Sequence, residues 1–425
     1  MKIKTVAIGQ GGGPTPVIND EVAGALYVAK KHNLRVLGIR NGLEGLMNAD
    51  TSGNIIDISG WEPDYVSEIP GAVLHTTRMK VEKGKDDAAI ETILRNMDRF
   101  GINSIAYFGG NDSSLILQAL GIGVHGSKTI DNDLMEAHHT PGYGSAALFN
   151  AIALRNLALD IGSFSSRGTT NSAESYLTAP VLVYQTMGRD TGWLALAAGF
   201  AKVRQDGSLD PEAPPDIIWP RELPFDKDVY LGELSNILQR RGRAFVVIGE
   251  ELVNSDGVII EKLYGETLED AHGHTQHARS GTFNYADWLA KISKELKVGG
   301  VASIKETPIS PQHIQRSYMK STTDAAESFD VGMETMNAIL DGDNQISVVL
   351  KQNPEFNPFY RMRAERVPVQ LLAGKTRSVP LEFINGVKGP TEEFIKQFLP
   401  VIGYEDALPH HHALDFSRIV HPRKE

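Results

Sequence analysis

The pattern of apolar and polar positions predicts strands and helices in alternation along the chain. Short apolar runs that end in glycine or polar turns predict strands at 5–9, 35–38, 104–108, 181–186, 216–219 and 244–248. Apolar residues spaced near 3.6 positions predict helices between them, at 17–31, 86–99, 113–120, 145–159 and 285–296. This alternation is typical of parallel sheets with helices on both faces. We therefore expect an α/β protein.

Composition and charge limit the partners of the chain. It has 425 residues, of which 41% are hydrophobic, no cysteine, and a formal net charge of -11. The negative charge argues against nucleic acid and anionic membranes as partners, and the missing cysteines exclude disulfides and thiolate catalysis. The first residues do not form a signal-peptide pattern, and no apolar run reaches the roughly 18 residues of a membrane span. We expect a soluble, cytoplasmic protein.

Two segments carry candidate phosphate chemistry. Residues 109–113 (GGNDS) follow an apolar run, so backbone amides at a strand's carboxyl end can approach an anion closely. A purely structural reading, in which Asn111, Asp112 or Ser113 caps the next helix, stays open. Residues 127–133 (SKTIDND) gather a lysine, a threonine and two carboxylates. Phosphoryl transfer uses such groups to neutralise charge, deprotonate a hydroxyl and hold a metal.

A glycine-rich turn at 9–14 (GQGGGP) precedes the first predicted helix, whose amino terminus could hold a phosphate. A tight turn without a ligand explains the same residues. A nucleotide-binding oxidoreductase is disfavoured, because Pro14 and Pro16 interrupt the spacing of the dinucleotide fingerprint.

Together these segments resemble the phosphofructokinase family, and specifically its pyrophosphate-dependent branch. The family pattern is found, in family order, as GGN at 109–111, TIDND at 129–133, MGR at 187–189, Glu250 at a strand end, and HIQR at 313–316. The resemblance covers residues 1 to about 350. It implies two Rossmann-like three-layer lobes with mostly parallel sheets and the active site in the cleft between them.

The resemblance also implies a division of the chain and a reaction. Residues 1–142 would form the donor lobe, rejoined by part of 316–350, residues 143–315 the sugar-phosphate lobe, and 351–425 an extension to which no motif assigns a role. The implied reaction moves a phosphoryl group from pyrophosphate to the 1-hydroxyl of fructose 6-phosphate. It is reversible and glycolytic, uses Mg²⁺, and gives fructose 1,6-bisphosphate and phosphate. The family further implies a homodimer or homotetramer.

The resemblance assigns roles to single residues. Asp131 is similar to the general base, Asp133 to a residue that assists it and could hold Mg²⁺, and Asn111 to the position at the metal. Asparagine replaces a commoner aspartate there and would grip Mg²⁺ more weakly. Residues that resemble the donor site are Gly12, Arg78, Gly110 and Lys128. Residues that resemble the sugar-phosphate pocket are Thr129, Asp131, Met187, Gly188, Arg189, Glu250, His313 and Arg316.

Asp112 and Lys128 decide the expected donor, because relatives that use ATP typically have glycine at both positions. A carboxylate at Asp112 would face the inner phosphate of a nucleotide. We expect this buried like-charge contact to cost roughly several kcal/mol, which is enough to exclude ATP. Lys128 would stabilise the charge that develops on pyrophosphate. Pyrophosphate is therefore the predicted donor, with ATP as the alternative.

Two departures from the family pattern leave the acceptor open. Pro180 stands where relatives place an arginine that crosses the subunit interface to the sugar 6-phosphate, and Lys305 is the nearest candidate for the second crossing arginine. A larger acceptor such as sedoheptulose 7-phosphate is one alternative, and a catalytically silent regulatory subunit is another. The triplet at 410–412 (HHH) could bind a transition metal, but a histidine-rich tail is the favoured interpretation.

Overall fold

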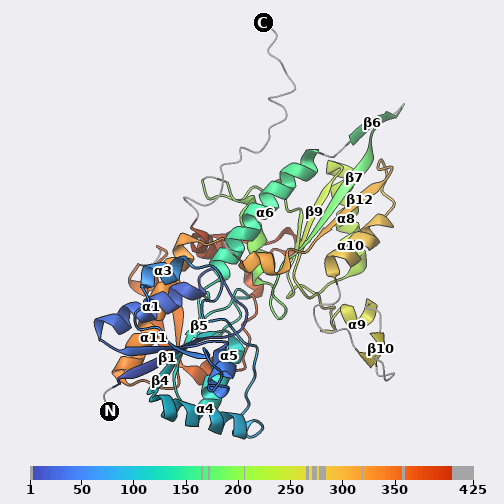
Figure 1. The fold of residues 1–425 in the computed structure, drawn as a ribbon. Helices are drawn as coiled ribbons and strands as arrows, with labels where there is room; N and C mark the ends of the chain where they lie inside the picture. The colour runs from blue at the N-terminus through green and yellow to red at the C-terminus, as the bar shows by residue number, and fades with distance from the viewer. Residues whose placement is uncertain are drawn as a thin grey trace.

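The computed structural model describes residues 3–163, 166–170, 173–204, 206–264, 268–269, 275–276, 284–317, 319–356 and 359–403. Two lobes, each built on its own sheet, lie on either side of the long helix α6 (Tyr143–Ser163) (Figure 1). The chain is thus an α/β protein, as the pattern predicts. The histidine triplet at 410–412 lies outside the described residues. Within the described ranges, no helix is both long and apolar enough to cross a membrane.

The first lobe contains a seven-stranded sheet in the order β14-β13-β5-β4-β1-β2-β3. Its five inner strands are parallel, and β3 and β14 pair antiparallel at the two edges. The strands are β1 (Thr5–Gln10), β2 (Arg35–Ile39), β3 (Ile55–Asp57), β4 (Ser104–Gly109), β5 (Val124–Ser127), β13 (Ile346–Gln352) and β14 (Met362–Pro368). The helices are α1 (Ile18–Lys31), α2 (Gly42–Met47), α3 (Pro63–Glu68), α4 (Asp87–Phe100), α5 (Asn111–Leu120) and α11 (Thr322–Asp341).

Alternating residues of the first sheet enter two separate cores. Val6 and Ile8 of β1 pack with α1 and α11 on one face, whereas Ala7 packs with α2, α4 and α5 on the other. Helices α1 and α11 approach closely because each has a glycine at the crossing. A Cβ at Gly24 would collide with the Phe329 carbonyl, and one at Gly332 with the Glu21 backbone. This crossing brings residues 322–341, late in the chain, beside the amino-terminal helix.

The second lobe contains a sheet in the order β12-β7-β9-β8, all parallel, with β6 antiparallel to β7. Its strands are β6 (Ser166–Thr170), β7 (Ala173–Gln185), β8 (Ile217–Trp219), β9 (Ala244–Ile248) and β12 (Ile304–Ile309). Helices α8 (Lys227–Arg241) and α10 (Tyr285–Lys294) cover one face, and α6 and η1 (Ala198–Lys202) the other. The remaining elements of this lobe are α7 (Trp193–Ala197), α9 (Glu261–Tyr264), β10 (Leu268–Glu269), β11 (Thr275–Gln276) and η2 (Gln312–Arg316).

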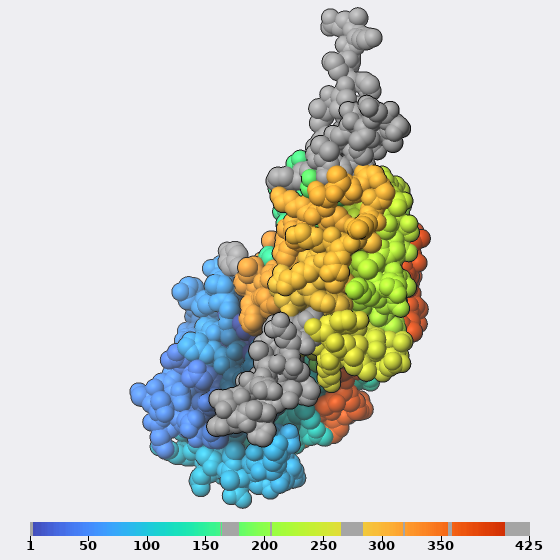
Figure 2. All heavy atoms as spheres, turned by 90° about the vertical axis from the view of Figure 1, so that its right-hand side faces the viewer, coloured from blue at the N-terminus to red at the C-terminus, as the bar shows by residue number. Residues whose placement is uncertain are grey.

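The described part of the C-terminal segment contacts both lobes. Strand β14 closes one edge of the first sheet, and α12 (Glu392–Phe398) packs Phe394 and Phe398 against Trp193 of α7. In Figure 2 the blue residues form a lower body and the yellow-green to orange residues an upper one, with red C-terminal residues visible beside both. The short helices of the C-terminal segment are η3 (Pro354–Phe356), η4 (Val369–Leu371), η5 (Leu381–Phe383), η6 (Gly386–Lys388) and η7 (Leu399–Ile402). The expected domain bounds remain a prediction.

Candidate active site

The glycine-rich turn after β1 contacts the side chain of Lys128. The Gly11 amide donates to the Phe108 carbonyl (2.8 Å) and the Gly12 amide to the Thr77 carbonyl (3.0 Å), which fixes the turn between β4 and the chain before Arg78. Gly12 has a φ of +74°, a conformation that favours glycine. Lys128 Nζ donates to the carbonyls of Gly11 (3.0 Å) and Gly13 (2.7 Å). The structure therefore brings together the turn and the lysine that the sequence assigns to the donor.

Lys128 is a buried cation with a buried acid behind it. Its side chain is 2% exposed, and burial lowers its pKa to about 8, opposed mainly by the charge of Glu21. Glu21, in the first turn of α1, has both carboxylate oxygens buried without a hydrogen-bond partner among the described residues, and burial raises its pKa well above its usual value. No motif of the sequence marks Glu21.

The loop after β5 faces the turn after β7. The Asp131 amide donates to Thr129 Oγ1 (3.1 Å), and Thr191 Oγ1 donates to the Asp131 carbonyl (3.1 Å). Gly188 has a φ of +108°, and a Cβ there would lie 4.0 Å from Asp131 Oδ1. The Asp131 carboxylate thus points to the MGR turn, where the sequence places the sugar. This contact joins the two lobes at the site.

Both aspartates of the loop hold their protons more tightly than ordinary carboxyls. Burial raises the pKa of Asp131, and the charges of Arg189 and Arg316 oppose the shift. Burial, and then the charge of Asp131, raise the pKa of Asp133 to about 7. A general base is most effective with a pKa near the working pH, so these shifts suit proton abstraction.

The MGR turn is held by two side chains. The Gly188 amide donates to Glu250 Oε2 (3.0 Å), and burial raises the pKa of Glu250 to about 7. The Met187 amide donates to Oε1 of Gln315 (3.2 Å), a buried side chain that also accepts from Asn150 (3.0 Å). Gln315 lies inside the HIQR motif, but its role is visible only in the structure, because the motif marks His313 and Arg316.

Arg316 reaches from η2 to the donor turn. A Cβ at Gly13 would collide with its guanidinium, and its Nε is buried without a hydrogen-bond partner among the described residues. Burial lowers the pKa of Arg316, as does the charge of Arg78, and the charge of Arg316 in turn lowers the pKa of His313. The charge of Arg316 also acts on Asp131. An anion with several negative charges would satisfy Arg316 and Arg78.

Asn111, the expected metal position, is bound by the C-terminal segment. Its Nδ2 donates to the Lys375 carbonyl (2.8 Å), and its Oδ1 accepts from the Gly374 amide (2.8 Å). Within the described residues, no group of three or more histidine or acidic side chains could hold a metal ion. Asp131 and Asp133 remain neighbouring carboxylates. This donor set fits Mg²⁺, which is usually held by one or two carboxylates together with substrate phosphates.

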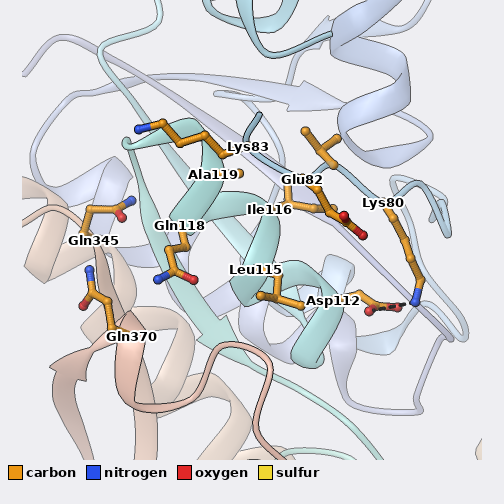
Figure 3. A pocket seen from close by; sticks show the side chains of 11 residues that line it. Lys80, Glu82, Lys83, Asp112, Leu115, Ile116, Gln118, Ala119, Gln345 and Gln370 are labelled. Atoms are coloured by element: carbon orange, nitrogen blue, oxygen red, sulfur yellow. Dashed lines mark ion pairs between the residues drawn. The ribbon is translucent and has the colours of Figure 1, made fainter. Parts of the chain in front are cut away.

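The surroundings of Asp112 correct one expectation. Its carboxylate pairs with Lys80 Nζ (3.2 Å), its side chain is 56% exposed, and it borders a pocket of about 530 Å³ between α5 and residues 80–83 (Figure 3). The expected buried like-charge contact with a nucleotide phosphate is therefore wrong in its burial. Water and Lys80 screen this charge, so its repulsion of a phosphate is weaker than we expect from the sequence.

Pro180 and Lys305 are direct neighbours across the second sheet. Pro180 is buried in β7, and Lys305 is its register partner in β12, where the lysine is exposed at the edge of the sheet. Both positions that depart from the family pattern thus lie side by side in the second sheet.

Comparisons with known proteins agree with this arrangement. The family model described as "Phosphofructokinase" matches residues 5–339. The "Pyrophosphate--fructose 6-phosphate 1-phosphotransferase" of Rhodospirillum rubrum is 30% identical over 422 residues, covering 94% of both chains. The protein of the same name from Xanthomonas campestris pv. campestris is 29% identical over 417 residues, covering 94% of this chain and 91% of the relative.

A solved structure shows the same fold. The crystal structure of a pyrophosphate-dependent phosphofructokinase from Marinobacter aquaeolei superposes with a TM-score of 0.73, covering 96% of this chain and 95% of that one at 23% identity. The seven-stranded and five-stranded sheets described above are thus those of a known architecture. On the family match and this fold, the chain belongs to the phosphofructokinase family.

Proposed function

We propose that the chain transfers a phosphoryl group from pyrophosphate to the 1-hydroxyl of fructose 6-phosphate. The observation that carries the proposal is Lys128, whose buried ammonium bonds the carbonyls of Gly11 and Gly13 at the donor turn. A cation fixed at this place favours a compact, highly charged donor over the inner phosphates of a nucleotide. The names of the Rhodospirillum and Xanthomonas relatives support the same donor and acceptor.

The residues of the site divide into donor, acceptor and acid-base groups. Pyrophosphate would bind at the donor turn, between the Gly110 amide and the cations Lys128 and Arg78. The Gly12 amide, which donates to the Thr77 carbonyl, would contact pyrophosphate only by exchanging that partner. The sugar phosphate would bind across the MGR turn. Its candidate contacts are Thr129, Met187, Gly188, Arg189, Glu250, His313 and Arg316.

Asp131 would take the proton of the 1-hydroxyl as the oxygen attacks the terminal phosphorus. The new P–O bond forms on the sugar, the bridging P–O bond breaks, and the second phosphate leaves with the electron pair of that bond. Asp133, two residues along the same loop, would assist Asp131 and, when it holds Mg²⁺, would stay ionised. Lys128 would balance the charge on the leaving phosphate. The reverse reaction follows the same path, because both directions pass through the same transition state: phosphate attacks the 1-phosphate of the bisphosphate, and Asp131 returns the proton to the sugar oxygen.

Mg²⁺ would be held by Asp133 together with phosphate oxygens of the donor. When bound, it neutralises phosphate charge and orients the donor. Asn111 Oδ1 keeps one lone pair beside its bond to Gly374, so it could be a further ligand of Mg²⁺. The direction of this lone pair depends on the C-terminal segment, because Gly374 and Lys375 orient the amide.

A second acceptor is favoured by one observation, the buried Pro180 in the place of the family arginine. It removes a charge that would meet the acceptor's far phosphate and leaves Lys305 as the adjacent cation. Sedoheptulose 7-phosphate, a longer sugar phosphate, is the candidate. Because β12 is an exposed sheet edge, a homodimer or homotetramer, in which a second copy completes this end of the pocket, is part of the proposal. So is a cytoplasmic location.

The test crosses donors with acceptors on the purified protein. Pyrophosphate, polyphosphate, ATP and ADP are each combined with fructose 6-phosphate and with sedoheptulose 7-phosphate, and bisphosphate formation is measured. Turnover with pyrophosphate and not with ATP supports the proposal, and turnover with ATP alone overturns it. Asp112→Gly with Lys128→Gly should relax the donor choice, whereas Asp112→Gly alone should do so weakly, because that carboxylate is exposed.

A further inference from the structure

Four consecutive residues of the C-terminal segment bond to both loops of the candidate active site. Gly374 and Lys375 hold the Asn111 amide through two hydrogen bonds of 2.8 Å. Thr376 forms an antiparallel bridge with Leu134, and the next amide donates to the Asp133 carbonyl (2.7 Å). We call residues 374–377 the strap. They lie beyond residue 339, where the match to the family model ends.

Arg377 ends the strap with a half-buried side chain that binds backbone carbonyls of the catalytic loop. Its Nε (3.3 Å) and Nη2 (2.9 Å) both donate to the Asn132 carbonyl, and Nη1 donates to the carbonyls of His138 (2.8 Å) and Ala137. The planar fork of an arginine suits such a set of converging carbonyls. One guanidinium thus ties together both ends of the loop from 132 to 138.

Trp193 fixes the guanidinium on its other side. The indole ring lies 4.3 Å from Arg377 Cζ, and Trp193 Nε1 donates to the Arg377 carbonyl (3.0 Å). Since Trp193 follows the MGR turn by four residues, the arginine is in contact with both the loop of the aspartates and the helix that begins after the sugar turn.

The backbone that Arg377 holds has an uncommon conformation. Asn132, between the two aspartates, has a φ of +55°, in the left-handed region that asparagine adopts more readily than other non-glycine residues. Its carbonyl receives two of the guanidinium bonds. Since this residue sets the directions of the chain on either side of it, relaxation of Asn132 would turn the Asp131 carboxylate away from the MGR turn and would also redirect Asp133.

The charge of Arg377 is also unusual. Its hydrogen-bond acceptors are neutral carbonyls, and among the described residues no carboxylate forms an ion pair with it. Burial lowers its pKa to about 10, and the charge of Asp133 opposes this shift. A half-buried cation without an ion pair loses hydration that no counter-charge repays, so a contact that only packed the fold would be served better by an apolar residue.

We propose that Arg377 is a positioning residue for phosphoryl transfer, which holds Asn132 in its left-handed conformation and thereby aims Asp131 and Asp133. The inference rests on the proposed function. It assigns the C-terminal segment a part in the site: the strap connects the start of α5 to the catalytic loop, and Arg377 is the residue through which it acts.

The test compares Arg377→Lys and Arg377→Met with Arg366→Met. Arg366 is the matched control, because it lies in the same C-terminal segment and bonds the carboxylates of Glu334, Asp341 and Asp343, away from the site. Displacement of reacting groups by about 1 Å can cost on the order of 100-fold, so we expect kcat to fall by about 10- to 100-fold in both Arg377 variants. KM values for both substrates should change by less than about threefold, because the donor turn with Lys128 and the MGR turn with Glu250 lie outside the loop that moves. Arg366→Met should keep kcat within about twofold at a comparable loss of Tm.

Hydrogen–deuterium exchange supplies the readout that does not depend on turnover. Faster exchange of amides 130–138 in Arg377→Lys, with unchanged exchange in β1 and β4, is expected. The inference is overturned if either Arg377 variant keeps kcat within about twofold, or if Arg366→Met loses as much kcat at equal Tm. If Arg377→Met does not fold, Arg377→Lys decides. If the unmodified protein transfers no phosphoryl group, the proposed function fails, and unchanged exchange over 130–138 still overturns the role of Arg377.

Discussion

Replacing Lys128 by methionine should remove most of the turnover with pyrophosphate and leave the fold in place. Methionine keeps the length of the buried stem but has no ammonium for the carbonyls of Gly11 and Gly13. The methionine also removes the cation beside Glu21. Burial already raises the pKa of that acid, and the loss of the Lys128 charge raises it further, so Glu21 binds a proton more readily in the variant.

The size of the effect follows from the contacts that are lost. A preorganised donor to transition-state charge is worth about 2.7–4 kcal/mol, so kcat with pyrophosphate should fall about 100- to 1000-fold. Each of the two hydrogen bonds from the ammonium contributes about 1.5–3 kcal/mol to the folded state. A coupled assay of bisphosphate formation gives kcat and KM, and urea denaturation gives the free energy of unfolding.

Lys320→Met is the matched control for this substitution. Lys320 Nζ pairs with the carboxylate of Asp20 (2.9 Å) and donates to the Ser67 carbonyl (2.7 Å). Asp20 precedes Glu21 in α1, so the control removes the same ammonium group from a neighbouring acid outside the site. It should lose stability and keep kcat within about threefold. The reasoning is refuted if Lys128→Met keeps more than about a third of kcat, or if the control loses as much as Lys128→Met.

Three further outcomes are expected. The pKa of about 8 predicts that Lys128 loses its proton as the pH rises past 8, so kcat/KM for pyrophosphate should fall there, and a pH–rate profile of Lys128→Met should lack this limb. Gly188→Ala places a Cβ 2.9 Å from the Thr191 carbonyl at a φ of +108°, so kcat should fall at least about tenfold with a loss of about 1–3 kcal/mol in urea denaturation. Asp324→Asn weakens the hydrogen bonds from the Ser145 hydroxyl and two backbone amides at the start of α6, and thermal unfolding should show a loss of about 2–4 kcal/mol with kcat retained.

The elements that the sequence predicted are those whose burial shows as an apolar run. Strands β1, β4 and β9 and helices α1, α4 and α10 lie within a few residues of the predicted ranges. Strand β5 reads Val-His-Gly-Ser and β12 carries Lys305 and Glu306, so neither has a run to detect. The register partners of β5 supply its burial: it lies between β4 and β13, and only the fold brings these together.

The candidate site was predictable where its residues are adjacent in the chain. Lys128, Thr129 and Asp131 stand in one loop with the side chains that phosphoryl transfer uses, and the structure places them beside the donor turn and the MGR turn. Gln315 and Arg377 could not be found this way. Both side chains bind backbone groups that are more than 100 residues away in the sequence; Met187 and Gln315, for example, are separated by 128 residues. Contacts between such distant residues leave no pattern in the sequence.

The measurement that tests the account most directly is bisphosphate formation from pyrophosphate and fructose 6-phosphate by the unmodified protein and by Asp131→Asn. Asparagine keeps the shape of the side chain and cannot take the proton of the sugar hydroxyl. The account predicts turnover by the unmodified protein and a loss of at least about 1000-fold in the variant, with KM values little changed. No transfer from pyrophosphate by the unmodified protein, or turnover within tenfold of it by a folded Asp131→Asn, would contradict the account.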